Sequence, residues 1–267
     1  MTTQFAQPSV LNTSVRVTNR LLWWVGVAHL VLSLIFGLLS LFDERQVLGL
    51  NVWLKPLKFS LAIVIYAFTI DWFLRLSDLK PNVKRRVALL SAVCMVVEIA
   101  IIAGQAWRGQ MSHFNESSLL NGILFAVMGL FIYANTAMVG YLLFRFFRQS
   151  TIADYPASLL WSIRWGTAIF MVGCLEGGLM VLNKAHTVGA ADGGAGLPFL
   201  NWSINAGDLR IAHFVGLHAL QLLPLVTYGL IRLNRAPSVS QVGVMAAVYF
   251  VVNLGLLATA YLGKPLF

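Results

Sequence analysis

Residues 87–107 read VALLSAVCMVVEIAIIAGQAW, a run in which Glu98 is the sole charged side chain. A helix needs about 20 consecutive, mostly apolar residues to cross a hydrocarbon layer about 30 Å thick. The cationic stretch KPNVKRR at 80–86 precedes the run and Arg108 follows it, as expected where a helix leaves the bilayer. This stretch therefore predicts a transmembrane helix.

Stretches of the same character occur along the whole chain. We predict seven spans, at 21–42, 57–77, 87–107, 119–146, 157–183, 208–232 and 239–263. The chain has 267 residues, of which 58% are hydrophobic and 11% charged. Soluble domains carry about 25% charged residues, so an ordinary cytosolic enzyme is excluded.

The predicted fold class is therefore all-α: a polytopic integral membrane protein with a bundle of about seven transmembrane helices. We expect a cytoplasmic N-terminal segment at 1–20 and a single transmembrane domain at 21–267. Cys94 and Cys174 both fall inside apolar spans, which argues against a disulfide framework. The spans and their loops use up the chain, so we expect no built-in ATPase or kinase module.

The formal net charge of +9 is concentrated in short loops rather than spread along the chain. This pattern indicates membrane lipids as partners and argues against nucleic acid. One set of loops and span ends holds eleven Lys and Arg residues: Arg16, Arg20, Arg75, Lys80, Lys84, Arg85, Arg86, Arg145, Arg148, Arg232 and Arg235. The opposite side holds seven: Arg45, Lys55, Lys58, Arg108, Lys184, Arg210 and Lys264.

Because cytoplasmic loops are enriched in Lys and Arg, we predict that the N-terminus is cytoplasmic and the C-terminus outside. The expected location is the cell (inner) membrane, with the functional face toward the periplasm or exterior. The predicted turn between the first two spans contains Pro56, Lys55 and Lys58 and is expected at the membrane interface.

The sixth span carries polar residues that lipid does not favour. At 100° per residue, Arg210, Phe214, Leu217 and Gln221 share one strip, which His213 and His218 flank. Ionisable groups inside spans are expensive unless they are paired or hydrated, so each marks a candidate functional site. We expect this face to point into the bundle.

Other spans contribute further candidates for a polar pocket. Glu98 lies on the third span, Glu176 on the fifth and His29 on the first. Just beyond the spans, Lys55, Lys58, Arg108 and His113 would form a cationic vestibule, and with Gln221 they are our predicted substrate- or anion-binding residues. The predicted site is an outward-opening pocket for a small-molecule ligand or a cofactor, formed by spans one, three, five and six.

Three kinds of chemistry fit these residues. His29 and His218 lie at similar depths and are the predicted ligands of a single b-type haem, with Arg210 near its propionates. A transition-metal enzyme would use His213 and His218 as ligands and Glu98 or Glu176 as general base, whereas a metal-free acid–base enzyme would use Glu98, Glu176 and His213 as catalytic groups. The alternative is a proton-coupled transporter or channel for a small, possibly anionic, solute.

Several residues also have plain structural interpretations. Lys55, Lys58 and Arg108 are equally suited to binding phospholipid phosphates. Asp71 and Arg75 have the spacing of a local ion pair on a helix. His186 and Asp192 fall in the long Gly- and Ala-rich stretch before the sixth span, where we expect both to be solvated.

Overall fold

The computed structural model describes residues 20–267, so the predicted segment 1–20 lies outside the described residues except for Arg20. This part of the chain forms seven long helices, each apolar enough to cross a membrane. They are α1 (Arg20–Phe42), α2 (Leu54–Leu76), α3 (Pro81–Trp107), α4 (Leu119–Arg148), α5 (Ala157–Asn183), α6 (Leu209–Arg232) and α7 (Val239–Tyr261). The predicted all-α bundle of seven spans is confirmed.

The main departures from the predicted spans are at the starts of α2 and α3. Pro56, Lys55 and Lys58 belong to the first turns of α2, so the predicted interfacial turn at these residues is wrong. Likewise most of KPNVKRR is helical, because α3 begins at Pro81. Proline is well tolerated in the first turn of a helix, where backbone N–H groups have no partner within the helix.

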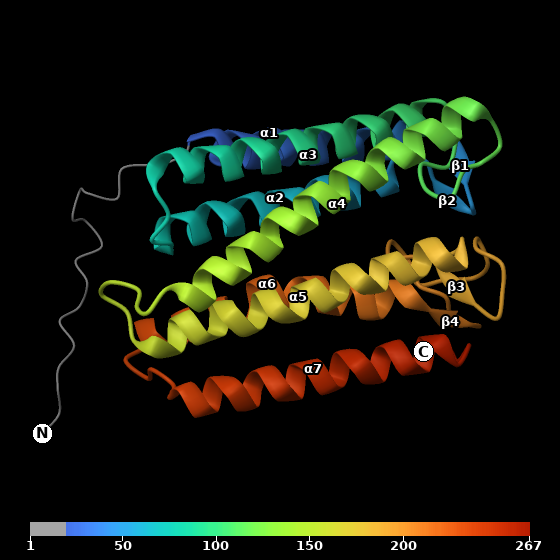
Figure 1. The fold of residues 1–267 in the computed structure, drawn as a ribbon. Helices are drawn as coiled ribbons and strands as arrows, with labels where there is room; N and C mark the ends of the chain where they lie inside the picture. The colour runs from blue at the N-terminus through green and yellow to red at the C-terminus, as the bar shows by residue number, and fades with distance from the viewer. Residues whose placement is uncertain (1–19) are drawn as a thin grey trace, which may run out of the picture.

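Successive helices run in opposite directions and pack as an extended bundle (Figure 1). Helix α1 packs on α2 and α3, whereas α6 packs on α5 and α7, and α4 connects α3 to α5. The closest pair is α5 and α6. A Cβ on Gly173 would lie 2.7 Å from the backbone of Gly216, and a Cβ on Gly166 would lie 2.6 Å from the carbonyl oxygen of Ala219. Small residues are what allow helix backbones in a membrane to approach this closely.

The two ends of the bundle differ. At one end lie two short antiparallel hairpins, β1 (Gln46–Val47) with β2 (Leu50–Asn51), and β3 (Thr187–Val188) with β4 (Gly207–Asp208). We call this the hairpin end; the loops 108–118 and 184–208 lie there too (Figure 1).

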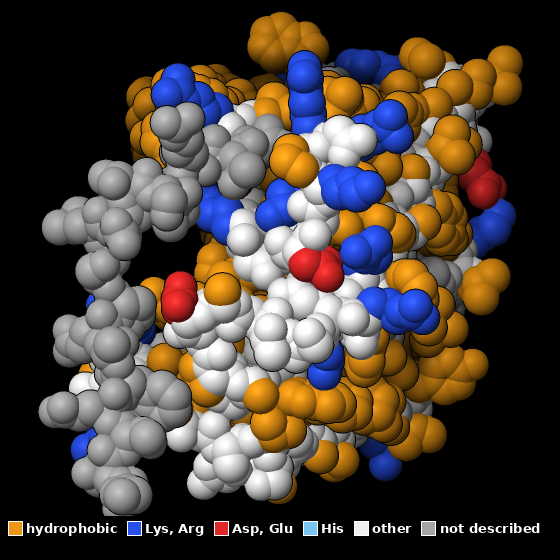
Figure 2. All heavy atoms as spheres, turned by 60° about the vertical axis from the view of Figure 1, so that its left-hand side comes forward, with side chains coloured by type: hydrophobic (Ala, Val, Ile, Leu, Met, Phe, Trp, Pro, Cys, Tyr) orange, Lys and Arg blue, Asp and Glu red, His pale blue; other side chains and the backbone are white. Residues whose placement is uncertain are grey.

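We call the opposite end the basic end, because Lys and Arg side chains gather on it and few acidic ones lie between them (Figure 2). Its cations belong to the start of α1, the α2–α3 turn, the end of α4 and the α6–α7 turn: Arg20, Lys80, Lys84, Arg85, Arg86, Arg145, Arg148, Arg232 and Arg235.

Polar side chains tie the helices together at the basic end. The predicted ion pair between Asp71 and Arg75 is present. Arg164 on α5 donates to the carbonyl oxygens of Phe146 (3.0 Å) and Gln149 (2.7 Å), which are backbone acceptors at the end of α4. The last carbonyls of a helix have no partner within it, so Arg164 acts as a cap from the neighbouring helix. Its guanidinium also lies over the Trp161 ring.

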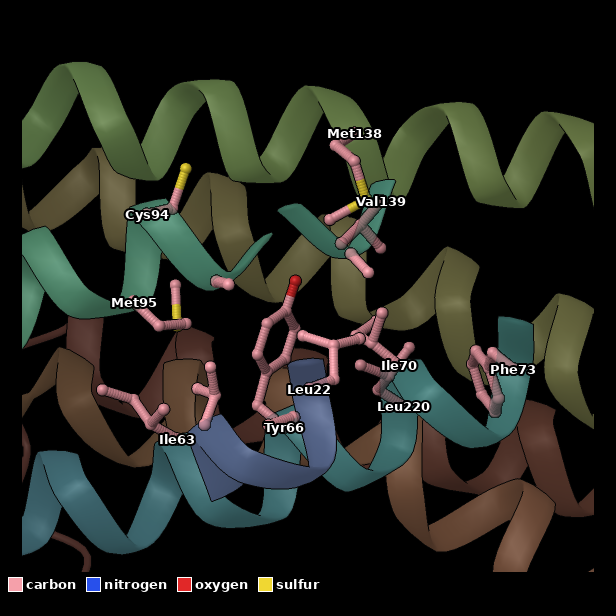
Figure 3. Close-up of a cluster of buried hydrophobic side chains, with 14 of the residues drawn as sticks. Leu22, Ile63, Tyr66, Ile70, Phe73, Cys94, Met95, Met138, Val139 and Leu220 are labelled. Carbon is pink, nitrogen blue, oxygen red and sulfur yellow. The ribbon is translucent and has the colours of Figure 1, made fainter. Parts of the chain in front are cut away.

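The main core runs along the bundle and is built from side chains of α1 to α6 (Figure 3). Tyr66 of α2 is buried there and donates to Asn135 Oδ1 of α4 at 2.8 Å. The outer faces of the helices are apolar: Leu41, Leu182 and Leu130, for example, are more than 60% exposed. An apolar exterior around a core with a few paired polar groups is the pattern of a membrane bundle.

Candidate functional site

A carboxyl group and an imidazole meet near the hairpin end. Glu98 on α3 is 3% exposed, and its Oε1 lies 3.9 Å from Nε2 of His113. Its Oε2 is buried without a hydrogen-bond partner. Lys55 on α2 is close enough to Glu98 and His113 to act on both electrostatically. Three of the predicted site residues therefore come together, from α2, α3 and the loop that follows α3.

Aromatic rings enclose His113. The ring centroids of Phe59 and Phe125 lie 5.7 and 6.0 Å from that of the imidazole. Burial, together with the positive electrostatic influence of Lys55, His186 and His213, holds the pKa of His113 well below its usual value. His113 is therefore neutral at pH 7.

The loop 184–208 adds a second histidine–carboxylate pair. His186 Nδ1 lies 2.5 Å from Asp192 Oδ2, and the same carboxylate accepts bonds from the backbone N–H groups of His186 and Thr187. The expectation that His186 and Asp192 are solvated is therefore wrong. The loop folds back on itself and half-buries both side chains.

These contacts fix the protonation of the pair. Burial would raise the pKa of Asp192, but its hydrogen bonds from His186 and Thr187 outweigh this and hold the pKa well below its usual value. Burial lowers the pKa of His186. An ionised carboxylate can only accept, so Nδ1 of His186 carries the hydrogen and Nε2 has the lone pair when the ring is neutral.

His213 on α6 has a similarly fixed ring. Its Nδ1 lies 2.7 Å from the carbonyl oxygen of Gly173 on α5, and a carbonyl can only accept. The ring lies against Gly177, where a Cβ would come within 2.9 Å of its Cε1. His213 is electrostatically coupled to His186 and to His113. Three histidines from two loops and one helix thus lie in one region, and two of them have Nε2 as their available basic atom.

The other cations of the predicted site already have hydrogen-bond partners within the protein. Arg210 donates through Nε to Asp208 Oδ1 at 2.9 Å and pairs with Oδ2 of the same side chain, which is fully buried. Lys58 Nζ donates to the carbonyl oxygen of Leu200 at 3.2 Å. Arg108 donates to Gln105 Oε1 at 2.6 Å. By contrast, Lys55 makes no ion pair or side-chain hydrogen bond in the described part of the chain, and its nearest aromatic contact is Phe59.

Four predicted site residues lie elsewhere. Glu176 lies between α5, α6 and α7. His218 packs against Phe214 at 4.2 Å between ring centroids and lies beside Gln221, whose Oε1 is buried without a partner. His29 donates from Nδ1 to the Val25 carbonyl oxygen of its own helix at 2.7 Å. The predicted inward face of α6 is partly exposed, since Phe214 is 45% exposed.

The arrangement does not favour either predicted cofactor. His29 and His218 lie on α1 and α6, which pack on different neighbours, and Nε2 of His29 is buried without a hydrogen-bond partner, so a haem between these two residues stays a prediction. Among residues 20–267, no three His, Cys, Asp or Glu side chains are grouped so that they could hold a metal ion. His213 and His218 as metal ligands stay a prediction without a third ligand. Acid–base chemistry needs fewer convergent groups and fits the residues better.

The space beside this region is small. A cavity of about 100 Å³ lies between the loop 187–205 and Arg210, and Thr187, next to His186, lines it. None of Lys55, Glu98 and His113 is among the residues that line it. Comparisons with protein-family models, with curated proteins and with solved structures find no match to this chain. The chemistry of the residues therefore carries the argument on function.

Proposed function

We propose that the protein is a membrane protein that binds a small weak acid near the hairpin end, where Lys55, Glu98 and His113 bind its anion and exchange its proton. We call these three residues the acid-binding cluster. The observation that carries the proposal is the contact between His113 and Glu98, next to a cation without an anionic partner at ion-pair distance. Buried titratable groups held together in this way are unusual in a membrane bundle unless they serve a function.

Each residue of the cluster has a chemical role in this proposal. His113 is neutral at pH 7, so it can accept a proton from the bound acid. Lys55 supplies the positive charge that the resulting anion needs in a region of low dielectric. Glu98 keeps one oxygen free of hydrogen bonds, so it can accept one from the ligand.

The same proposal assigns an orientation to the molecule. The basic end would face the cytoplasm, following the bias of Lys and Arg toward that side of membrane proteins. The hairpin end and the acid-binding cluster would then face the periplasm or exterior of a cell membrane. Lys264→Cys and Arg235→Cys place a thiol at exposed positions at opposite ends of the bundle. In intact cells, a membrane-impermeant thiol reagent should label the first variant and leave the second unlabelled.

Short monocarboxylates are the probes that test the proposed function. The melting temperature of the full chain in nanodiscs would be measured with acetate, propionate and butyrate, and with the primary alcohols of equal length. We expect the carboxylates to stabilise the protein and the alcohols to have no effect. In Lys55→Met the apparent Kd should weaken at least tenfold, which is about 1.4 kcal/mol of binding free energy.

Lys264→Met is the matched control, because Lys264 is exposed at the same end and lies outside the cluster. It should bind the carboxylates as the wild type does. His113→Asn removes the proposed proton acceptor, so it should reduce the pH dependence of binding. Equal stabilisation by carboxylate and alcohol, or equal Kd in Lys55→Met and Lys264→Met, would refute the proposal.

A further inference from the structure

A second buried carboxyl group lies apart from the acid-binding cluster, where α5, α6 and α7 meet. Glu176 on α5 is 2% exposed, and neither of its oxygens accepts a hydrogen bond. It fits against α6 because Gly216 has no side chain: a Cβ there would lie 3.1 Å from Glu176 Oε2. The contact is part of the close α5–α6 packing at Gly173.

The neighbouring residue on α7 is Asn253, which is fully buried beside Glu176. Its Nδ2 donates to the carbonyl oxygen of Ala212 on α6 at 2.8 Å. Because a carbonyl can only accept, this bond fixes which way the amide points. Asn253 Oδ1 is then left buried without a partner. The interface thus contains three buried oxygens that accept no hydrogen bond.

No positive charge offsets these oxygens. The groups that face or adjoin Glu176 are the thiol of Cys174 on α5, the imidazole of His213 on α6, and Asn253 and Tyr249 on α7. Nδ1–H of His213 donates to the carbonyl oxygen of Gly173. The Tyr249 hydroxyl donates to the carbonyl oxygen of Val215 at 2.6 Å. Across residues 20–267 Glu176 takes part in no ion pair. An isolated carboxylate in such a place is costly, and such a group takes up a proton instead.

We propose that Glu176 is a proton-binding site: it holds one proton at neutral pH, with the side-chain amide of Asn253 as its neighbour on α7. The proton removes a buried negative charge that no described ion pair offsets. The ligand of this site is the proton itself. The site goes beyond the proposed acid-binding function, since it lies on different residues and different helices.

Infrared spectroscopy of the full chain in nanodiscs tests the proposal. The carbonyl stretch of a protonated carboxylic acid lies above the amide I band, where ionised carboxylates do not absorb. The spectrum of wild type minus Glu176→Gln at pH 7 should show one such band, which moves to lower frequency in D₂O. In Asn253→Leu the band should move to higher frequency, because the carboxyl group loses a hydrogen-bonding neighbour.

Glu116→Gln is the matched control, because it makes the same substitution at an exposed glutamate that pairs with Lys184. Its difference spectrum should show only ionised-carboxylate bands. If Glu176→Gln fails to fold, Glu176→Asp retains an acid whose band should be displaced. The proposal is overturned if the Glu176 difference spectrum contains only carboxylate bands. It is also overturned if the acid band disappears on adding NaCl at constant pH, which would make the site one for a monovalent cation.

Discussion

The buried carboxyl groups near the basic end differ from those in the half of the bundle nearer the hairpin end. Near the basic end Asp71 is paired with Arg75, and Arg164 gives its donors to two backbone carbonyls of the α4 terminus. In the other half, Glu98 and Glu176 are buried as deeply but retain oxygens without hydrogen-bond partners. Arg164 thus joins α5 to α4, whereas the unpaired carboxyl groups are those that we propose for a ligand and a proton.

Buried side-chain amides also differ between the two regions, and Gln149 is the example at the basic end. Its Oε1 accepts from the Asp78 N–H at 3.0 Å, and its Nε2 donates to the carbonyl oxygens of Leu76 and Thr151. The amide therefore joins the end of α2 to the α4–α5 loop. Gln221 and Asn253, toward the other half, each keep a buried amide oxygen without a partner.

The largest effect is expected from Arg164→Ala at the basic end. The substitution removes two hydrogen bonds to buried carbonyls and the stacking on Trp161, and should lower the free energy of unfolding by about 3 kcal/mol. Unfolding in mixed detergent micelles measures it. Arg148→Ala, at an exposed site on the same end, should change stability by less than about 0.5 kcal/mol. Similar effects of the two substitutions would show that the contacts of Arg164 do not stabilise the basic end.

The next effect concerns the helix pair that carries Glu176 and His213. Gly173→Ala places a methyl group 2.7 Å from the backbone of Gly216, and should destabilise the protein by about 2 kcal/mol through overpacking. Gly178→Ala adds the same methyl group where no atom lies within 4 Å, so it should leave the unfolding free energy unchanged or slightly raised. If both glycines tolerate alanine equally, the close α5–α6 contact is not the constraint that we describe.

The smallest effect is the pH dependence of stability that His113 contributes. Its folded-state pKa is lowered from about 6.5 by burial and by neighbouring positive charge, so below pH 6.5 the unfolded chain binds more protons. Stability should therefore fall as the pH falls from about 6.5, by at most about 1.4 kcal/mol per pH unit from this residue. His113→Asn should reduce that slope, while His186, whose pKa is lowered too, contributes part of what remains. An unchanged slope in His113→Asn would show that His113 is not buried in a neutral form.

The spans were predictable because each is a long run of apolar residues, and the lipid core sets their minimum length. The starts of α2 and α3 were less predictable, since Pro56 and the charged residues at 80–86 indicate a turn locally and yet fit the first turns of a helix. Helix ends depend on the caps and neighbours that a hydrophobic pattern does not contain.

The site was predictable in part for a similar reason. Glu98, His113 and Lys55 were found because a charge inside or just beside an apolar run is conspicuous. His186 and Asp192 were missed, since a Gly-rich loop has no periodicity that indicates which side chains turn inward. Asp208 was also missed, although its position just before α6 is that of a helix cap, which it fills by accepting from the Arg210 N–H. Asn253 is a lone amide in an apolar span, and its importance depends on Glu176 from another helix.

The contact between Gly173 and Gly216 has a mechanical consequence. Where two backbones touch without side chains between them, the helices cannot slide or rotate past each other without a collision. Helices α5 and α6 should therefore move as one rigid body in any conformational change. The distance between Glu176 and His213 would then stay constant. Any relative motion within the bundle would then occur elsewhere, at the contacts that this pair makes with α4 and α7.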